Sequence, residues 1–131
     1  MVSIAATPSG DGILHAPSRT ATVAFAQAAI NIAAAGSVTF TPTTTAFGQP
    51  QHDLPLTMTI CPSDSKTGAC LQPPGPSATI QVANNQIVTL STFVQGQGQA
   101  IPFDPANNRV YIMATQGGTA VGASSVAVDV P

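Results

Sequence analysis

Short runs in which apolar and polar residues alternate dominate the chain, and this pattern is typical of β-strands that bury one face. The clearest is LPLTMTI (54–60), where Leu, Met and Ile alternate with Pro and Thr. Four more runs follow the same period: TATVAF (20–25), SVTFT (37–41), SATIQVA (77–83) and VGASSVAVDV (121–130). We therefore predict strands that turn one face to a core and the other to water.

Two runs carry apolar residues on both faces, QIVTLSTFVQ (86–95) and RVYIMAT (109–115), as expected of strands in the middle of a sheet. The alanine-rich segment AFAQAAINIAAAG (24–36) is the one place where a helix competes with a strand. Because Ile30 and Ile32 alternate around a single asparagine, we predict a strand there, with a short helix as the alternative.

Turn-forming sequences separate these runs, and the 12 prolines of the chain discourage helix. The turns are PSGDG, SDSKTG, PPGP, ANNQ, QGQGQ, FDPANN and QGG. About eight short strands at this spacing predict an all-β fold, a two-sheet sandwich with Greek-key connections, and barrel closure is the alternative. We expect residues 1–131 to form one domain, in which 1–18 is an extended N-terminal segment or a first edge strand.

Formal charge is scarce, with three basic and five acidic residues and a net charge of −2 at pH 7. Nucleic acid binding requires a basic stripe, which this chain lacks, so we expect no nucleic acid partner. No apolar run approaches the roughly 20 residues of a membrane span. A surface of Thr, Ser, Gln and Asn repels copies of itself weakly, which favours self-association.

The two cysteines, Cys61 and Cys70, flank the turn-forming sequence PSDSKTGA. A zinc site needs about four N or S ligands at short spacing, and a redox pair is normally Cys-x-x-Cys at a helix start, so both fit poorly. A disulfide across a hairpin fits better, because Cys61 ends one predicted strand and Cys70 precedes the next. In the alternation of 54–60, Cys61 falls on the threonine side, at the outer face or rim. Such a bond predicts an extracellular or cell-surface location, with the periplasm as the alternative.

No catalytic arrangement emerges, so we expect neither an enzyme nor a cofactor. The neighbours His52 and Asp53 point to opposite faces if they lie on a strand, and no G-x-S-x-G sequence is present. We interpret His52 and His15 as residues of solvated loops.

Two loop features are candidates for binding. Asp104, Asn107 and Asn108 offer oxygen ligands to calcium, although a turn cap formed by Asp104 is the simpler interpretation. We expect no other metal site. Phe47 and Phe103 lie in predicted loops and are the candidate binding residues for a glycan or protein ligand.

Three segments have a combination of features known from one kind of module: LPLTMTICPSDSKTGACLQPP, FVQGQGQAIPFDPANNRVYIMAT and GASSVAVDV. They contain a strand that ends in Cys before a polar turn and a second Cys, an FDPxxNR corner, and a closing Ser-Ser-Val-Ala-Val strand. Together they resemble the Ig-like β-sandwich modules that recur in large secreted and cell-surface proteins of bacteria. The matching positions are Cys61, Cys70, Asp104, Pro105, Asn108, Arg109 and 125–128.

The resemblance covers roughly residues 20–130 and implies an Ig-like Greek-key β-sandwich of about 7–9 antiparallel strands, outside the cytoplasm, with one hairpin disulfide. Such modules are mostly spacers, adhesive units or assembly units. The chain departs from the pattern at Asp129, where a basic residue is expected.

We expect a non-catalytic extracellular structural module that packs against copies of itself or neighbouring surface domains, as a surface or filament subunit. Val2 and Ile4 mark the segment that is the candidate to add as a strand to a neighbour's sheet edge. The alternative is an adhesion module that binds a glycan or protein through loops 42–53, 95–108 and 116–120.

Overall fold

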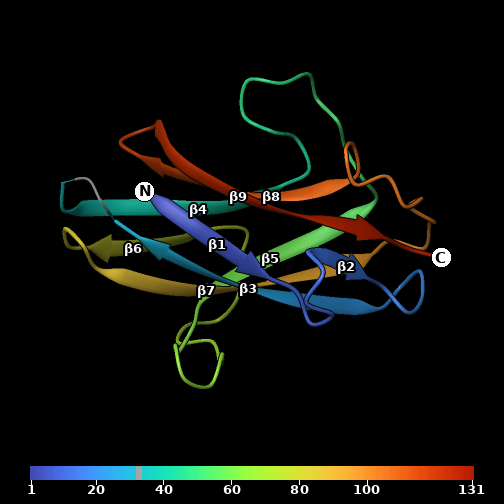
Figure 1. The fold of residues 1–131 in the computed structure, drawn as a ribbon, viewed down its shortest axis with the longest axis horizontal. Helices are drawn as coiled ribbons and strands as arrows, with labels where there is room; N and C mark the ends of the chain where they lie inside the picture. The colour runs from blue at the N-terminus through green and yellow to red at the C-terminus, as the bar shows by residue number, and fades with distance from the viewer. Residues whose placement is uncertain (32–33) are drawn as a thin grey trace.

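The chain forms nine β-strands within residues 1–31 and 34–131, the part that the computed structural model describes (Figure 1). They are β1 (Val2–Ala6), β2 (Ile13–His15), β3 (Thr22–Ile30), β4 (Gly36–Thr43), β5 (Leu56–Pro62), β6 (Ala78–Val82), β7 (Ile87–Gly96), β8 (Arg109–Gln116) and β9 (Thr119–Asp129). One sheet has the order β1-β3-β7-β5 and the other β2-β9-β8-β4-β6. The two packed sheets confirm the predicted all-β sandwich. The described residues contain no helix that could span a bilayer.

The predicted alternation supplies the core between the sheets. Val38 and Phe40 of β4 are fully buried, and Leu56 and Ile60 of β5 are buried as well. The other large core side chains are Leu14, Phe25, Val82, Val88, Leu90, Val94, Ile101, Val110, Ile112, Val126, Val128 and Val130. β7 and β8 each have a strand on both sides, so the prediction that 86–95 and 109–115 form central strands is confirmed.

The predicted strand over 24–36 is too long, because β3 ends at Ile30. Beyond it, the Asn31 N–H donates to the Gln86 carbonyl (3.0 Å) and Asn31 Nδ2 donates to the Ala83 carbonyl (3.3 Å). These bonds tie the residue after the strand to the turn that precedes β7. Ile32, the other half of the predicted alternation, lies outside the described residues.

The consecutive strands β5 and β6 do not pair with each other. β5 pairs with β7 in one sheet, whereas β6 pairs with β4 in the other. The prediction that the cysteines join two neighbouring strands is therefore wrong in this detail. The disulfide instead closes a local hairpin between the strands, which leaves the chain free to cross from one sheet to the other.

The N-terminal segment contributes an edge strand to each sheet. β1 pairs antiparallel with β3, while β2 pairs parallel with β9, a departure from the antiparallel prediction. β1 also lies beside β9, where the Met1 amino group donates to the Val121 carbonyl (3.0 Å) and Ser3 Oγ donates to the Ala123 carbonyl (3.3 Å). This segment thus closes one side of the sandwich.

Candidate functional site

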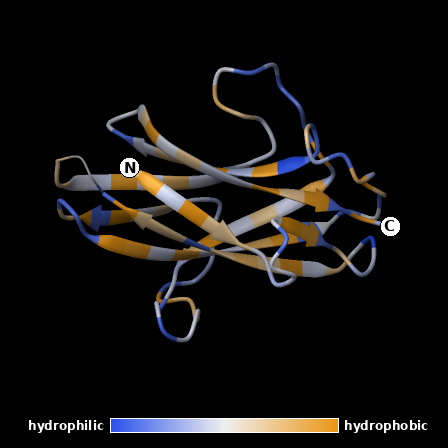
Figure 2. Ribbon diagram, in the orientation of Figure 1, coloured by the Kyte–Doolittle hydropathy of each residue, from blue (hydrophilic) through white to orange (hydrophobic). Residues whose placement is uncertain are grey.

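The outer face of the four-stranded sheet carries an uncharged apolar stripe over β1, β3 and the start of β7. Figure 2 shows how hydrophobic residues are distributed along these strands. The stripe consists of Val2, Ile4, Ala6, Ala24, Ala26, Ala28, Ile30 and Ile87. Val2, Ile4 and Ile87 are 57%, 73% and 66% exposed. Strands β1, β3, β5 and β7 contain no charged residue. Clustered exposure of this kind marks an interaction surface more often than isolated exposed residues do.

β1 has the reverse of the usual orientation of a surface strand, in which the larger apolar residues face the core. Its larger apolar residues, Val2 and Ile4, face solvent, whereas the small residues Ser3 and Ala5 face inward. Register with β3 fixes this orientation, because Val2 lies opposite Ile30 and the strand's period is two. The core gains little from β1, so its large side chains are available to a partner.

The predicted disulfide is confirmed between Cys61 and Cys70, whose Cα atoms lie 5.6 Å apart. The hairpin that it closes, residues 61–70, projects from the outer face of the four-stranded sheet (Figure 1). The Ser91 Oγ of β7 donates to the Gly68 carbonyl (3.1 Å), which holds this disulfide hairpin over the strand. Cys61 lies on the outer side, as predicted, but is fully buried because the hairpin covers it.

Asp64 caps the turn of the disulfide hairpin. Its Oδ1 accepts hydrogen bonds from the Lys66 N–H (2.8 Å) and the Thr67 N–H (3.1 Å). These two bonds lower the pKa of Asp64, because they favour the ionised carboxylate. The turn therefore depends on the carboxylate being charged.

The disulfide hairpin stands as a ridge between two hollows. On the β1 side, a hollow of about 260 Å³ has Ile4 and Ala26 on one wall and Gly68 on the other. A second hollow of about 590 Å³ is lined by apolar residues such as Leu71 and Ile87 and by polar residues that include Asp64. A partner surface that fits this relief would contact the stripe and the ridge together.

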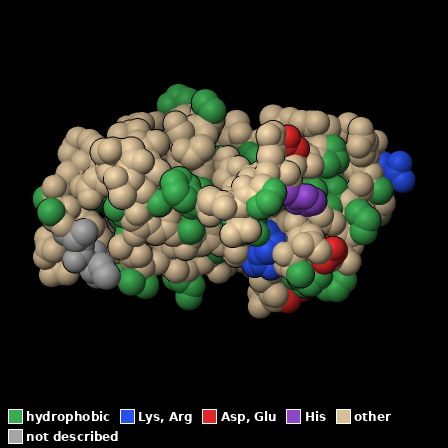
Figure 3. Space-filling view, turned by 90° about the horizontal axis from the view of Figure 1, so that it is seen from above, with side chains coloured by type: hydrophobic (Ala, Val, Ile, Leu, Met, Phe, Trp, Pro, Cys, Tyr) green, Lys and Arg blue, Asp and Glu red, His purple; other side chains and the backbone are tan. Residues whose placement is uncertain are grey.

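The outer face of the five-stranded sheet is different in chemistry, and Figure 3 looks onto the molecule from that side. Its hydroxyl-rich part, called here the hydroxyl face, consists of Ser37, Thr39, Thr41, Thr43, Thr79, Gln81, Thr115 and Ser125. Arg109, Tyr111 and Met113 of β8 lie on the same side of the sheet. Thr39 Oγ1 and Thr79 Oγ1 lie 2.9 Å apart, and Gln81 Nε2 donates to Ser37 Oγ. Charged side chains gather towards one end in Figure 3. Here the polar groups satisfy one another across strands.

Two of the predicted binding loops meet at one end of the sandwich. His52 Nε2 lies 3.3 Å from Asn108 Oδ1, and a pocket of about 250 Å³ between the loops is lined by residues that include Thr44, His52 and Tyr111. Phe47 and Phe103 are each 63% exposed in these loops. We call this the loop-end pocket.

His52 and Asp53 do not form a pair. Asp53 Oδ2 instead accepts a hydrogen bond from Gln51 Nε2 (2.6 Å), and His52 contacts Asn108. The arrangement does not resemble a charge-relay site.

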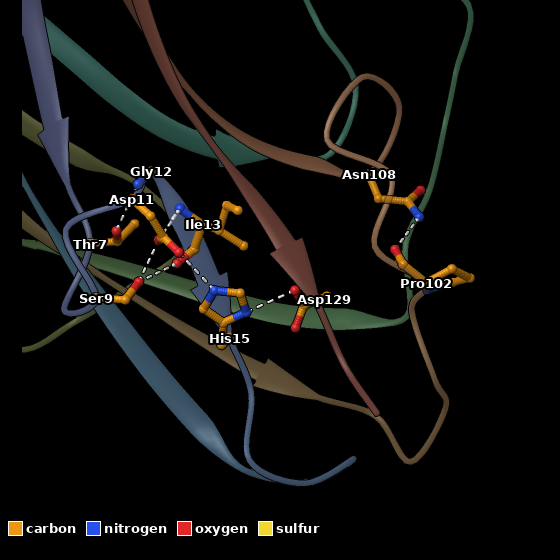
Figure 4. Close-up of polar contacts among 9 residues, drawn as sticks. All are labelled: Thr7, Ser9, Asp11, Gly12, Ile13, His15, Pro102, Asn108 and Asp129. Atoms are coloured by element: carbon orange, nitrogen blue, oxygen red, sulfur yellow. Dashed lines mark hydrogen bonds and ion pairs between the residues drawn. The ribbon is translucent and has the colours of Figure 1, made fainter.

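The calcium candidates are engaged in closing the corner before β8. Asp104 Oδ2 accepts from Asn107 Nδ2 (2.9 Å), and the Asn108 N–H donates to the Asp104 carbonyl (2.7 Å). Asn108 Nδ2 donates to the Pro102 carbonyl at 3.0 Å (Figure 4), and Arg109 Nη1 donates to the Pro105 carbonyl at 2.8 Å. The described residues include no group of three or more His, Cys, Asp or Glu side chains placed to hold a metal. Calcium binding here stays a prediction.

His15 lies between two carboxylates from opposite ends of the sequence (Figure 4). Its Nδ1 is 2.8 Å from Asp129 Oδ2, and its Nε2 is 3.0 Å from Asp11 Oδ2. Ser9 Oγ and the Ile13 N–H donate to Asp11 Oδ1. The prediction that His15 lies in a loop is wrong, because it belongs to β2, but its side chain is exposed as predicted. Asp129 lies far away in sequence, so no local pattern could indicate this contact.

The hydrogen bonds that Asp11 accepts, first from Ser9 and then from His15, lower the pKa of its carboxyl well below the usual range. The hydrogen bond to Asp11 also raises the pKa of His15 above 6.5, and the charge of Asp129 adds to this effect. The cluster therefore favours an imidazolium between two carboxylates.

Val2 and Ile4, the candidate strand to be donated to a neighbour, lie in β1 and pair with β3 of their own chain. Donation to a neighbour would require this pairing to be exchanged.

Comparison of the chain with protein-family models, with curated proteins and with solved structures found no match.

Proposed function

We propose that this chain is a non-catalytic extracellular structural module that associates with copies of itself or with neighbouring surface domains through the apolar stripe. The observation that carries the proposal is the exposure of Val2, Ile4 and Ile87 in one uncharged stripe, beside a hairpin that carries Asp64 and Lys66. Burying such side chains gains about 1.5–3 kcal/mol each when they go from full exposure to full burial. The stripe has no charge that a partner would need to neutralise.

The ridge and hollows on the outer face of the four-stranded sheet support a contact with a partner of complementary shape. The disulfide hairpin forms a ridge beside the stripe, and the hollows on its two sides have apolar walls. A neighbouring domain would place its own side chains in these hollows. The low charge of the chain supports close packing, because like copies repel each other weakly.

The extracellular location is part of the proposal. A disulfide persists in oxidising compartments, so Cys61–Cys70 supports secretion to the cell surface or to the periplasm. As a module in a surface assembly or filament, the chain would meet these conditions throughout its lifetime.

We also propose that the sandwich is Ig-like. Ig-like sandwiches place strands A, B, E and D in one sheet and C, F and G in the other. The order β1-β3-β7-β5 and the neighbours β9-β8-β4 support such an assignment. β6 follows β5 in the sequence yet lies beside β4, where an Ig-like domain places a strand that precedes D.

Lysine substitution at two stripe positions tests the association. The variant Ile4→Lys/Ile87→Lys is expected to stay monomeric, because two desolvated charges oppose burial of the stripe. Sedimentation velocity and electron microscopy compare its oligomers or filaments with those of the unmodified chain.

The matched control, Thr41→Lys/Thr79→Lys, adds the same charge to the hydroxyl face and is expected to associate like the unmodified chain. A chain that stays monomeric up to about 1 mM would overturn self-association, since weaker contacts are worth less than about 4 kcal/mol. Equal loss in both variants would show that charge, and not the stripe, controls association.

A second candidate function is adhesion to a glycan or protein through the loop-end pocket. The observation that favours it is the meeting of two separate loops at His52 and Asn108 beside neutral hydrogen-bonding side chains. Glycan arrays and protein pull-downs test it with His52→Ala, which lines the pocket, and with Phe47→Ala/Phe103→Ala, which removes the exposed rings of the same loops. The control is Leu71→Ala, an exposed apolar residue outside these loops. Saturable binding that survives the double substitution would contradict a role for the two aromatic rings.

A further inference from the structure

We propose that His15, held between Asp11 and Asp129, is a pH-dependent latch that fastens the N-terminal segment to β9. The proposal goes beyond the proposed function and does not depend on it. It concerns how firmly β2 is attached to the sandwich, whatever the partner of the apolar stripe is.

The geometry assigns the protonation state of the closed latch. Both ring nitrogens of His15 face carboxylate oxygens, at 2.8 Å and 3.0 Å (Figure 4). A neutral imidazole has one N–H and one lone pair, so it can donate to only one of the two carboxylates. Its other nitrogen would place a lone pair against the second carboxylate. Only the imidazolium donates to both.

The latch adds to a short backbone contact between β2 and β9. β2 has three residues, and its main chain reaches β9 through bonds that include Ala127 N–H to the Gly12 carbonyl (3.0 Å) and Ala16 N–H to the Asp129 carbonyl (3.1 Å). Leu14 anchors the strand in the core, where it is 1% exposed. Loss of the latch therefore favours local opening of β2 while the sandwich stays folded.

The other charged groups around β2 and β9 have other partners. The Met1 amino group donates to the Val121 carbonyl of β9 (3.0 Å). Arg109, on β8 next to β9, donates from Nε to Ser125 Oγ (3.1 Å) and from Nη1 to Pro105. Arg19 Nε donates to the Pro131 carbonyl (3.0 Å). Within the described residues, Asp11 and Asp129 are the charged groups that contact His15.

The sign of the pH dependence follows from these contacts. Because the folded pKa of His15 is raised, its contribution is complete below pH 6.5 and is lost as pH rises through the folded pKa. Because the pKa of Asp11 is lowered, its contribution is complete above pH 3.8 and is lost as pH falls through the folded pKa. The latch is closed between these limits and opens as the pH rises through the folded pKa of His15.

A titration followed by NMR tests the proposal on the unmodified chain. The ring of His15 is expected to titrate above 6.5, and the β2-linked amides of Ala16 and Ala127 to exchange several-fold faster, after correction for intrinsic rate, as His15 loses its proton. The titration starts at about pH 5.5, where an ordinary histidine is protonated, and continues upward until the His15 ring signal stops shifting.

Variants separate the latch from a general effect of pH. Asp129→Asn and Asp11→Asn are each expected to lower the pKa of His15, and His15→Gln to leave the exchange of Ala16 and Ala127 independent of pH. The matched control His52→Gln is expected to keep the pH dependence of the unmodified chain. A His15 pKa at or below 6.5, or exchange at Ala16 that ignores its titration, overturns the proposal.

Discussion

The two outer faces of the sandwich differ in the side chains that they expose to solvent. Each belongs to a sheet whose inner face is covered by the shared core. The β1–β3 part of one outer face presents valine, isoleucine and alanine, whereas the β4–β6 part of the other presents threonine, serine and glutamine. On the hydroxyl face, polar groups pair with each other, as Thr39 does with Thr79. On the apolar stripe, Val2, Ile4 and Ile87 extend into solvent.

The difference shows which face is complete in the isolated chain. Hydrogen bonds between hydroxyl groups leave little for a partner to improve, whereas exposed apolar side chains gain from any surface that removes them from water. The inverted orientation of β1 sharpens the contrast, because that strand gives its larger residues to the outside. An association surface should therefore lie on one sheet only.

The largest change in the free energy of unfolding is expected from a substitution in the core, and it tests whether both sheets unfold cooperatively. Phe40 is fully buried on β4, and Phe40→Ala is expected to cost about 3–5 kcal/mol of the free energy of unfolding, because it leaves a cavity. Urea denaturation followed by NMR at both faces measures it. Phe47→Ala, at an exposed ring, should stay within about 0.5 kcal/mol. Signals of one face that persist after the other unfolds would break the comparison.

A smaller effect is expected from the ridge on the apolar side. Cys61→Ser/Cys70→Ser should lower the free energy of unfolding by about 2–3 kcal/mol, since the loop that the disulfide closes regains its freedom in the unfolded chain. Amide exchange should rise in the disulfide hairpin and stay unchanged at Thr39 and Thr41. Reduction of the unmodified protein serves as the control, and a matching loss of protection on the hydroxyl face would contradict the local role assigned to the hairpin.

Much of the fold could be predicted from the sequence, because a strand with one buried face repeats with period two. Phe40 and Val126 fall in such runs and are buried as the alternation predicts. Strand ends and partners are not local properties. β3 stops at Ile30 because Asn31 bonds to the turn before β7, and β6 joins β4 although β5 precedes it.

The candidate site could be predicted less well, for the same reason. The disulfide could be predicted from local sequence, because a short segment holds both cysteines with turn-forming residues between them. By contrast, His15 meets Asp129 only after β2 pairs with β9, and the two residues are far apart in sequence. The outward direction of Val2 and Ile4 is set by their register with β3, so it too required the folded structure.

The smallest expected effect is the coupling energy between two side chains on neighbouring strands, which can be compared between the two outer faces. A double-mutant cycle of Thr39→Val and Thr79→Val should give a coupling of about 0.2–1 kcal/mol, as expected for a cross-strand hydroxyl pair. The matched cycle uses Ile30→Ala and Ile87→Ala, which lie opposite each other on the stripe. Only the second pair should also change association. Zero coupling between the threonines would mean that water, not the neighbouring hydroxyl, satisfies them.

The parallel pairing of β2 with β9 has a mechanical consequence. Parallel strands point the same way, so the beginning of β2 and the end of β9 lie at opposite ends of their shared ladder. A pull that draws these two points apart loads the ladder bonds together in shear, instead of opening them one after another. The contact of His15 with Asp129 lies at the end of that ladder. Because β1 precedes β2 in the sequence and pairs with β3, a pull applied at Val2 and Asp129 would load the β1–β3 ladder as well as this one.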